Sequence, residues 1–192
     1  MERKTDPQAL GDRKKALEEQ FFARQERELR ERVRRQAADR ERREALAEAS
    51  GVQDPAVLDR LVALGIEPET VTALGLVPLV QVAWADRTLH DLERDAVLRA
   101  AESSGVGPDH PARGVLDGWL RERPGHDLLE AWKGYAGALA ESLEPSERDA
   151  LRREILDRAR NVAEAAGGFL GMGKVSDAEQ AVLDDLDAAF GA

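Results

Sequence analysis

The sequence predicts an all-α protein, in which a long charged N-terminal helix precedes a compact bundle of helices. Residues 12–49 contain neither proline nor glycine and are rich in Ala, Leu, Glu, Arg and Gln, all good helix formers. After residue 50, proline and glycine recur at intervals typical of short helices joined by tight loops. No segment alternates apolar and polar residues with the period of two that a half-buried strand requires.

The first predicted helix, residues 12–49, has a surface of balanced charge. It carries twelve basic and ten acidic residues. Pairs such as Glu26 with Arg30 and Glu28 with Arg32 have the four-residue spacing, acid before base, that stabilises a solvated helix. Its apolar residues form a thin stripe rather than a broad face. The stripe consists of Leu17, Phe21, Phe22, Leu29, Val33, Ala37 and Leu46.

Large apolar side chains within a polar rim are typical of the centres of protein interfaces. Half of the four phenylalanines of the chain, Phe21 and Phe22, stand together on this helix. We therefore expect it to bind a partner, which is another protein or a second copy of the chain, unless the stripe packs on the chain's own body. The candidate contact residues are Leu17, Phe21, Phe22, Leu29 and Val33.

The helices that follow are predicted from their start and stop signals. Asp54 and Pro55 begin a helix that Gly65 ends, Pro68 begins another, and the run at residues 76–85 is apolar on nearly all sides. We divide the chain into an arm (residues 1–49), a helical linker (residues 50–75) and a bundle (residues 76–192). Later helices are predicted over residues 90–103, 111–122, 127–143, 146–166 and 176–190.

Composition excludes several classes of function. The chain has no cysteine, which removes disulfides, thiolate metal sites and cysteine nucleophiles. No run approaches the 18 or so apolar residues that span a bilayer, so we expect a cytoplasmic protein without membrane insertion. Residues 50–192 carry 26 acidic against 14 basic residues, which disfavours nucleic-acid binding.

No motif predicts an enzyme or a bound cofactor. The segment GFLGMGK, residues 168–174, has the glycine and lysine spacing of a phosphate-binding loop. However, Val175 stands where that loop needs Ser or Thr, and a predicted helix rather than a strand precedes it. The three histidines form no pattern with Ser and Asp typical of nucleophilic catalysis.

A local unit occurs twice, at residues 88–97 and 174–183. Each copy has a loop, one aliphatic residue and a helix start. In the second copy, Ser176 and Glu179 predict a capping box, in which each side chain accepts a hydrogen bond from the other's backbone amide. In the first copy, His90 takes the serine position and predicts a weaker cap.

The segment ALGLVPLVQVAWADRTLHDLERDAVLRAA and the closing GKVSDAEQAVLDDLDAAF resemble the TerB-like tellurite-resistance family over about residues 70–190. The resemblance implies a compact helical bundle with a role in stress response, and acidic residues that hold metal ions or contact partners. Arg87 departs from the family, which usually has glycine there, and it argues against metal at that turn. The carried-over acidic residues are Asp86, Asp91, Glu93, Asp177 and Glu179.

The start of the arm is similar to the alphaproteobacterial F1-ATPase inhibitor (zeta) subunit. The match covers about ten residues, namely Asp12, Arg13, Lys15, Ala16, Glu18 and Phe21. We expect a non-enzymatic, cytoplasmic interaction or regulatory protein that acts through its helical arm and acidic bundle. The alternatives are an inhibitor of a rotary F-type ATPase and an acidic metal-binding stress protein.

Overall fold

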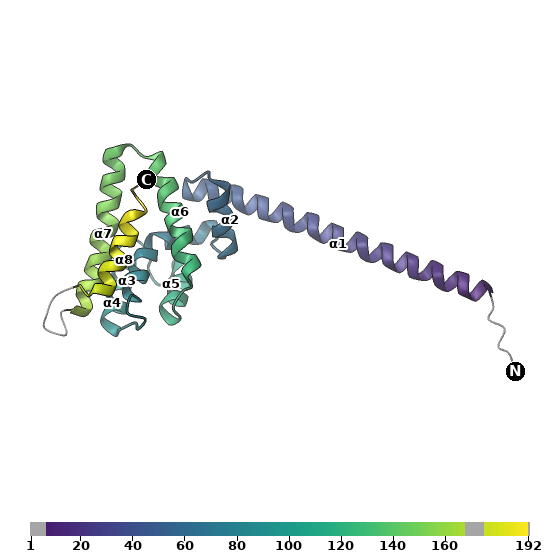
Figure 1. Ribbon diagram of the computed structural model, residues 1–192, viewed down its shortest axis with the longest axis horizontal. Helices are drawn as coiled ribbons and strands as arrows, with labels where there is room; N and C mark the ends of the chain where they lie inside the picture. The colour runs from purple at the N-terminus through teal and green to yellow at the C-terminus, as the bar shows by residue number, and fades with distance from the viewer. Residues whose placement is uncertain (1–6, 168–174, 192) are drawn as a thin grey trace. The chain divides into compact units, whose positions relative to one another are not determined.

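The structure, a computed structural model, describes the backbone of residues 7–167 and 175–191 and the side chains of residues 20–165 and 175–191. Every regular element in these ranges is a helix, which confirms the all-α prediction (Figure 1). The contacts within the chain form two compact units, Met1–Glu41 and Arg42–Ala192.

The first unit consists of most of helix α1, Pro7–Ser50. Ion pairs between described side chains stabilise its surface: Arg30 Nη2 lies 2.6 Å from Glu26 Oε1, and Arg24 Nε lies 2.9 Å from Glu28 Oε1. The first pair was predicted. In the second, Glu28 pairs with Arg24, four residues before it, rather than with Arg32, which the acid-before-base order favours.

The last turns of α1 belong to the second unit. Leu46 is fully buried there, and Ala47 and, just after the helix, Val52 are buried as well. Ion pairs hold the same turns: Arg42 Nε lies 3.2 Å from Glu67 Oε2, and Arg43 Nε lies 3.3 Å from Asp59 Oδ1. The end of α1 is therefore part of the hydrophobic core rather than part of a separate extension.

The segment between residues 50 and 75 forms helix α2, Pro55–Ala63, and a 3-10 helix η1, Pro68–Leu76. As expected, Asp54 caps α2, because its carboxylate accepts hydrogen bonds from the amides of Ala56 and Val57 at 2.7 and 3.3 Å. The segment contributes buried side chains to the hydrophobic core of the second unit. They include Val57, Leu58, Leu61, Ile66, Ala73 and Leu74.

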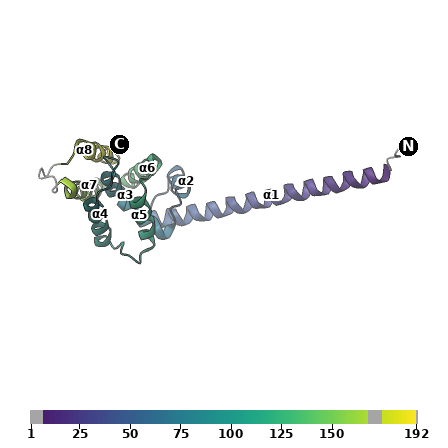
Figure 2. The ribbon, with the colours of Figure 1, turned by 90° about the horizontal axis from the view of Figure 1, so that it is seen from below.

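Helix α3, Val77–Ala83, is the centre of the second unit. Six of its seven residues are buried, and only Gln81 is partly accessible. The helix packs against η1, α4, α6, α7 and α8, and both ribbon views place it inside the bundle (Figures 1 and 2). At its C-terminal end, Trp84 Nε1 donates a 2.9 Å hydrogen bond to the carbonyl oxygen of Trp119.

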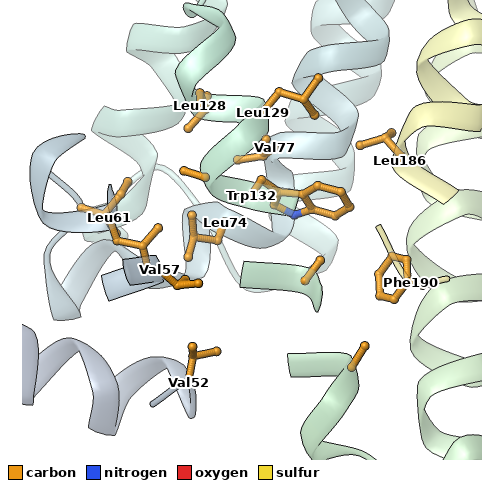
Figure 3. Close-up of a cluster of buried hydrophobic side chains, with 14 of the residues drawn as sticks. Val52, Val57, Leu61, Leu74, Val77, Leu128, Leu129, Trp132, Leu186 and Phe190 are labelled. Carbon is orange, nitrogen blue, oxygen red and sulfur yellow. The ribbon is translucent and has the colours of Figure 1, made fainter. Parts of the chain in front are cut away.

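Four of the remaining helices pack against α3, and the fifth, α5, packs against η1. They are α4 (Asp91–Ser103), α5 (Pro111–Arg121), α6 (His126–Ser142), α7 (Pro145–Gly167) and α8 (Asp177–Ala188). Trp132 of α6 is fully buried in the larger of two hydrophobic clusters, where its ring meets Phe190 edge to face at 6.1 Å (Figure 3). The smaller cluster includes Leu79, Leu116 and Val162.

Ion pairs on the surface connect the C-terminal helices. Arg152 of α7 pairs with both carboxylate oxygens of Asp187, and Lys133 Nζ of α6 lies 2.6 Å from Asp185 Oδ1. Hydrogen bonding to Arg152 lowers the pKa of Asp187 below its ordinary value. Such partly exposed pairs contribute little stability by themselves, so they orient α8 on a unit that the core already holds together.

No single helix of the described residues is both long and apolar enough to cross a membrane. The segments Pro55–Ala63 and Pro68–Ala83 reach that length and composition only as a pair, and the pair is bent by 93°.

Arg87, at the turn after α3, has a φ of +74°, in the left-handed region that favours glycine. We predict that Arg87→Gly raises the free energy of unfolding by about 1 kcal/mol, because glycine removes the steric cost of this conformation. Arg99→Gly in helix α4 is the control, and should instead lower it by about 1 kcal/mol. Urea denaturation measures both, and destabilisation by Arg87→Gly would contradict the strain argument.

The division at Glu41 predicts where the chain can be shortened. A fragment that starts at Arg42 keeps Leu46 and Val52 and should retain the melting temperature of the second unit. A fragment that starts at Asp54 loses both, and deletion of one buried leucine side chain alone costs roughly 2 to 5 kcal/mol. Thermal melts by circular dichroism test this, and equal stability of the two fragments would show that Leu46 and Val52 are dispensable.

Candidate interaction surface on the N-terminal helix

The exposed apolar side chains gather on one stretch of α1. Of the five large hydrophobic residues that are exposed in the described part of the chain, four lie between residues 21 and 33. Phe22 is 65 % exposed, and Phe21, Leu29 and Val33 are each more than half exposed. The fifth, Leu92, stands alone on α4. We call Phe21, Phe22, Leu29 and Val33 the exposed stripe.

Helical spacing aligns three members of the exposed stripe. Leu29 and Val33 follow Phe22 by seven and eleven residues, which places all three within about 40° around the helix axis. Phe21 lies about 100° away from Phe22. The two rings still touch, edge to face with centroids 5.9 Å apart. Phe21 therefore widens one end of a narrow stripe. The side chain of Leu17, also predicted as a contact residue, lies outside the described side chains.

A polar rim surrounds the exposed stripe. Phe22 and Leu29 line a shallow groove together with Gln25, Glu26, Glu28 and Arg32. Glu26 and Glu28 are already held in ion pairs along the helix. The apolar centre is thus free to be covered by a partner, and burying a side chain such as Phe22 fully is worth roughly 1.5 to 3 kcal/mol.

The acidic candidates lie elsewhere, at the starts of α4 and α8. Glu179 is buried and forms the predicted capping box with Ser176: Ser176 N donates to Glu179 Oε2 at 2.6 Å, and Glu179 N donates to Ser176 Oγ at 3.3 Å. Glu93 is also buried and accepts a 2.9 Å bond from His90 N. The reciprocal contact, from the backbone amide of Glu93 to the His90 ring, is present but lacks good hydrogen-bond geometry. This agrees with the weaker cap predicted there.

The other acidic candidates are exposed. Asp86 accepts a 2.8 Å hydrogen bond from Thr88 N and lies 3.6 Å from Nε2 of His90, while Asp91 and Asp177 are the first residues of their helices. Within the described side chains, no three His, Asp or Glu residues come together as a metal site would require. The segment GFLGMGK, residues 168–174, lies outside the described residues.

The charge of one buried carboxylate, Glu179, acts on the other, Glu93, which the sequence did not predict. Burial raises the pKa of Glu93 above its ordinary value, and the charges of Asp86 and Glu179 raise it further, while the hydrogen bond from His90 opposes the shift. The starts of α4 and α8 are therefore close enough for their charges to interact. The only sequence feature that links the two residues is that Glu93 and Glu179 occupy the same position of the two repeat units. That pattern could not show that both side chains are buried.

Comparison with family models, with curated proteins and with solved structures found no match. The likenesses to the TerB-like family and to the ATPase inhibitor subunit therefore stay predictions from the sequence.

The raised pKa of Glu93 predicts a pH dependence. A carboxyl group whose pKa is higher in the folded than in the unfolded state stabilises the fold when protonated, and that contribution is lost as the pH rises through the folded pKa. At a pH above the folded pKa, the buried charge of Glu93 is a cost that an amide avoids. We predict that Glu93→Gln is neutral or stabilising at pH 7, and that its advantage shrinks as the pH falls through the folded pKa towards the ordinary value of 4.5, below which the folded and unfolded states are both protonated.

Glu93→Ala is the control, because it also removes the titrating carboxyl but loses the acceptor for His90 N, and it should be about 1 kcal/mol less stable than Glu93→Gln at either pH. Chemical denaturation at pH 7 and pH 4 measures both variants. Should Glu93→Gln destabilise more at pH 7 than at pH 4, the ionised carboxylate is favoured in the fold and the argument from burial is wrong.

Proposed function

We propose that this chain is a non-enzymatic interaction protein, which contacts a protein partner through the exposed stripe of α1. The single observation that carries the proposal is the gathering of four exposed large hydrophobic side chains within thirteen residues of one helix. Exposed apolar groups lower stability and solubility, and contiguous ones mark interaction sites. The second unit supplies a stable folded body.

The chemistry of the surface favours a protein over a lipid or a nucleic acid. A helix that lies on a membrane has a wide apolar face and a polar face rich in Lys and Arg. Here the apolar stripe is narrow, and acidic residues alternate with arginines around it. The same acidic residues oppose the phosphate contacts that nucleic-acid binding needs.

A regulatory role in stress response and a cytoplasmic location form part of the proposal. Both rest on the sequence, the first on the TerB-like resemblance and the second on composition. The experiment below tests the same contact residues of the exposed stripe whether or not the role in stress response and the cytoplasmic location are correct.

We predict that the double change Phe21→Ala with Phe22→Ala abolishes capture of the partner. Truncation of both rings removes the largest apolar groups of the surface, and such anchors commonly cost 2 kcal/mol or more each, which is about thirtyfold in affinity. The measurement is affinity capture from the native cell with the full-length chain and the variant as baits, followed by mass spectrometry.

The matched control is Glu31→Ala with Arg34→Ala, which truncates two side chains on the far side of the helix and keeps the net charge. It should capture what the unchanged chain captures. If the phenylalanine variant retains the same proteins, or if the control loses them equally, the exposed stripe is not the contact surface.

A further inference from the structure

We infer that the exposed stripe pairs with the same stripe of a second copy of this chain, with the two helices antiparallel. The inference rests on the proposed function, that the stripe is a contact surface, and names its partner. Three properties of the first unit support a second copy: the charge distribution along α1, the spacing of the stripe residues and the width of the stripe.

Charge is distributed unevenly along the helix. Residues 18–31 carry five acidic and three basic side chains, whereas residues 32–41 carry four basic and two acidic ones. A parallel pair would place each stretch beside its own copy, and like charges repel. In the antiparallel pair described below, residues 18–23, which carry two acidic and no basic side chains, lie beside residues 32–37, which carry three basic and no acidic ones, so that attraction selects this direction.

The spacing of the stripe suits two-fold symmetry. Phe22 and Val33 are eleven residues apart on one line of the helix, about 16 Å along the axis. A two-fold axis between Arg27 and Glu28 therefore sets Phe22 of each copy opposite Val33 of the other. The same register brings Glu26 beside Arg30 of the second copy, which extends the ion pair that these residues form within one helix.

The width of the stripe limits its occupant to a single helix. Phe22, Leu29 and Val33 cover a narrow band, as in the contact lines of paired helices. A self-complementary patch of this kind closes as a dimer and exposes no further binding surface. The area is small, so the dimer should be weak and reversible.

The first test is sedimentation equilibrium of the full chain over a range of concentrations. We expect a monomer–dimer equilibrium that Phe22→Glu shifts at least tenfold towards the monomer, because the change buries a charge against Val33 of the second copy. Gln20→Glu adds the same charge on the opposite face and should leave the equilibrium unchanged. A chain that stays monomeric at every concentration overturns the inference.

The second test reports direction, and uses the absence of cysteine from the natural sequence. Gln25 and Gln36 are both exposed and share one face. In the antiparallel register, the two copies of residue 25 are about 8 Å apart along the axis and those of residue 36 about 26 Å apart. A short bismaleimide should therefore cross-link Gln25→Cys chains to each other and leave Gln36→Cys chains single.

Cross-linking of both variants would mean a parallel pair. Cross-linking of neither variant would mean that the chains do not pair in this register. Either result overturns the inference. These outcomes are separate from failure of the proposed function. If capture from the native cell depends on Phe21 and Phe22 while the chain is monomeric, the stripe binds a different protein.

Discussion

The burial of α3 is the constraint on which the second unit depends. A seven-residue helix with six buried residues cannot be stable unless other helices cover it on nearly every side. The apolar faces of η1, α4, α6, α7 and α8 do so, and the last turns of α1 add Leu46 to the same unit. The caps, the ion pairs and the tight turns adjust this arrangement, but the area buried around α3 is what opposes the entropy of the unfolded chain.

Residues 20–41 of α1 have no such support within their own unit. Their side chains are exposed, and the ion pairs of a solvated helix contribute only a few tenths of a kcal/mol each. Helices in proteins owe most of their stability to the packing of one face against other elements. The exposed stripe supplies a face that a partner would cover, so the stability argument supports the proposed interaction function as well as exposure does.

The sequence predicted the helices well because helix ends are encoded locally. Asp54 with Pro55, Ser176 with Glu179 and the proline and glycine positions set the boundaries through backbone hydrogen bonds that involve only neighbours. Burial is a property of the tertiary structure, and periodicity did not show how much core the segment at residues 50–75 contributes. For the same reason, the buried state of Glu93 and Glu179 could not be predicted from their spacing.

The candidate surface was more predictable than the geometry around it. Phe21, Phe22, Leu29 and Val33 were recognisable because they are large and apolar among charges, and the structure leaves them exposed. The ion-pair partner of Glu28 was not recognisable from the sequence, since an arginine lies four residues away on either side and both satisfy the same spacing. The left-handed backbone of Arg87 likewise depends on the turn that leads from α3 towards α4.

Hydrogen exchange of the full chain, measured at several protein concentrations, tests the central claim most directly. The account predicts that the backbone amides of α3 exchange only when the whole second unit unfolds, at every concentration. Amides of residues 20–41 should exchange much faster in dilute solution and become protected as the concentration rises. If those amides are as protected as α3 in dilute solution, the helix is stabilised without a second copy and the account is contradicted.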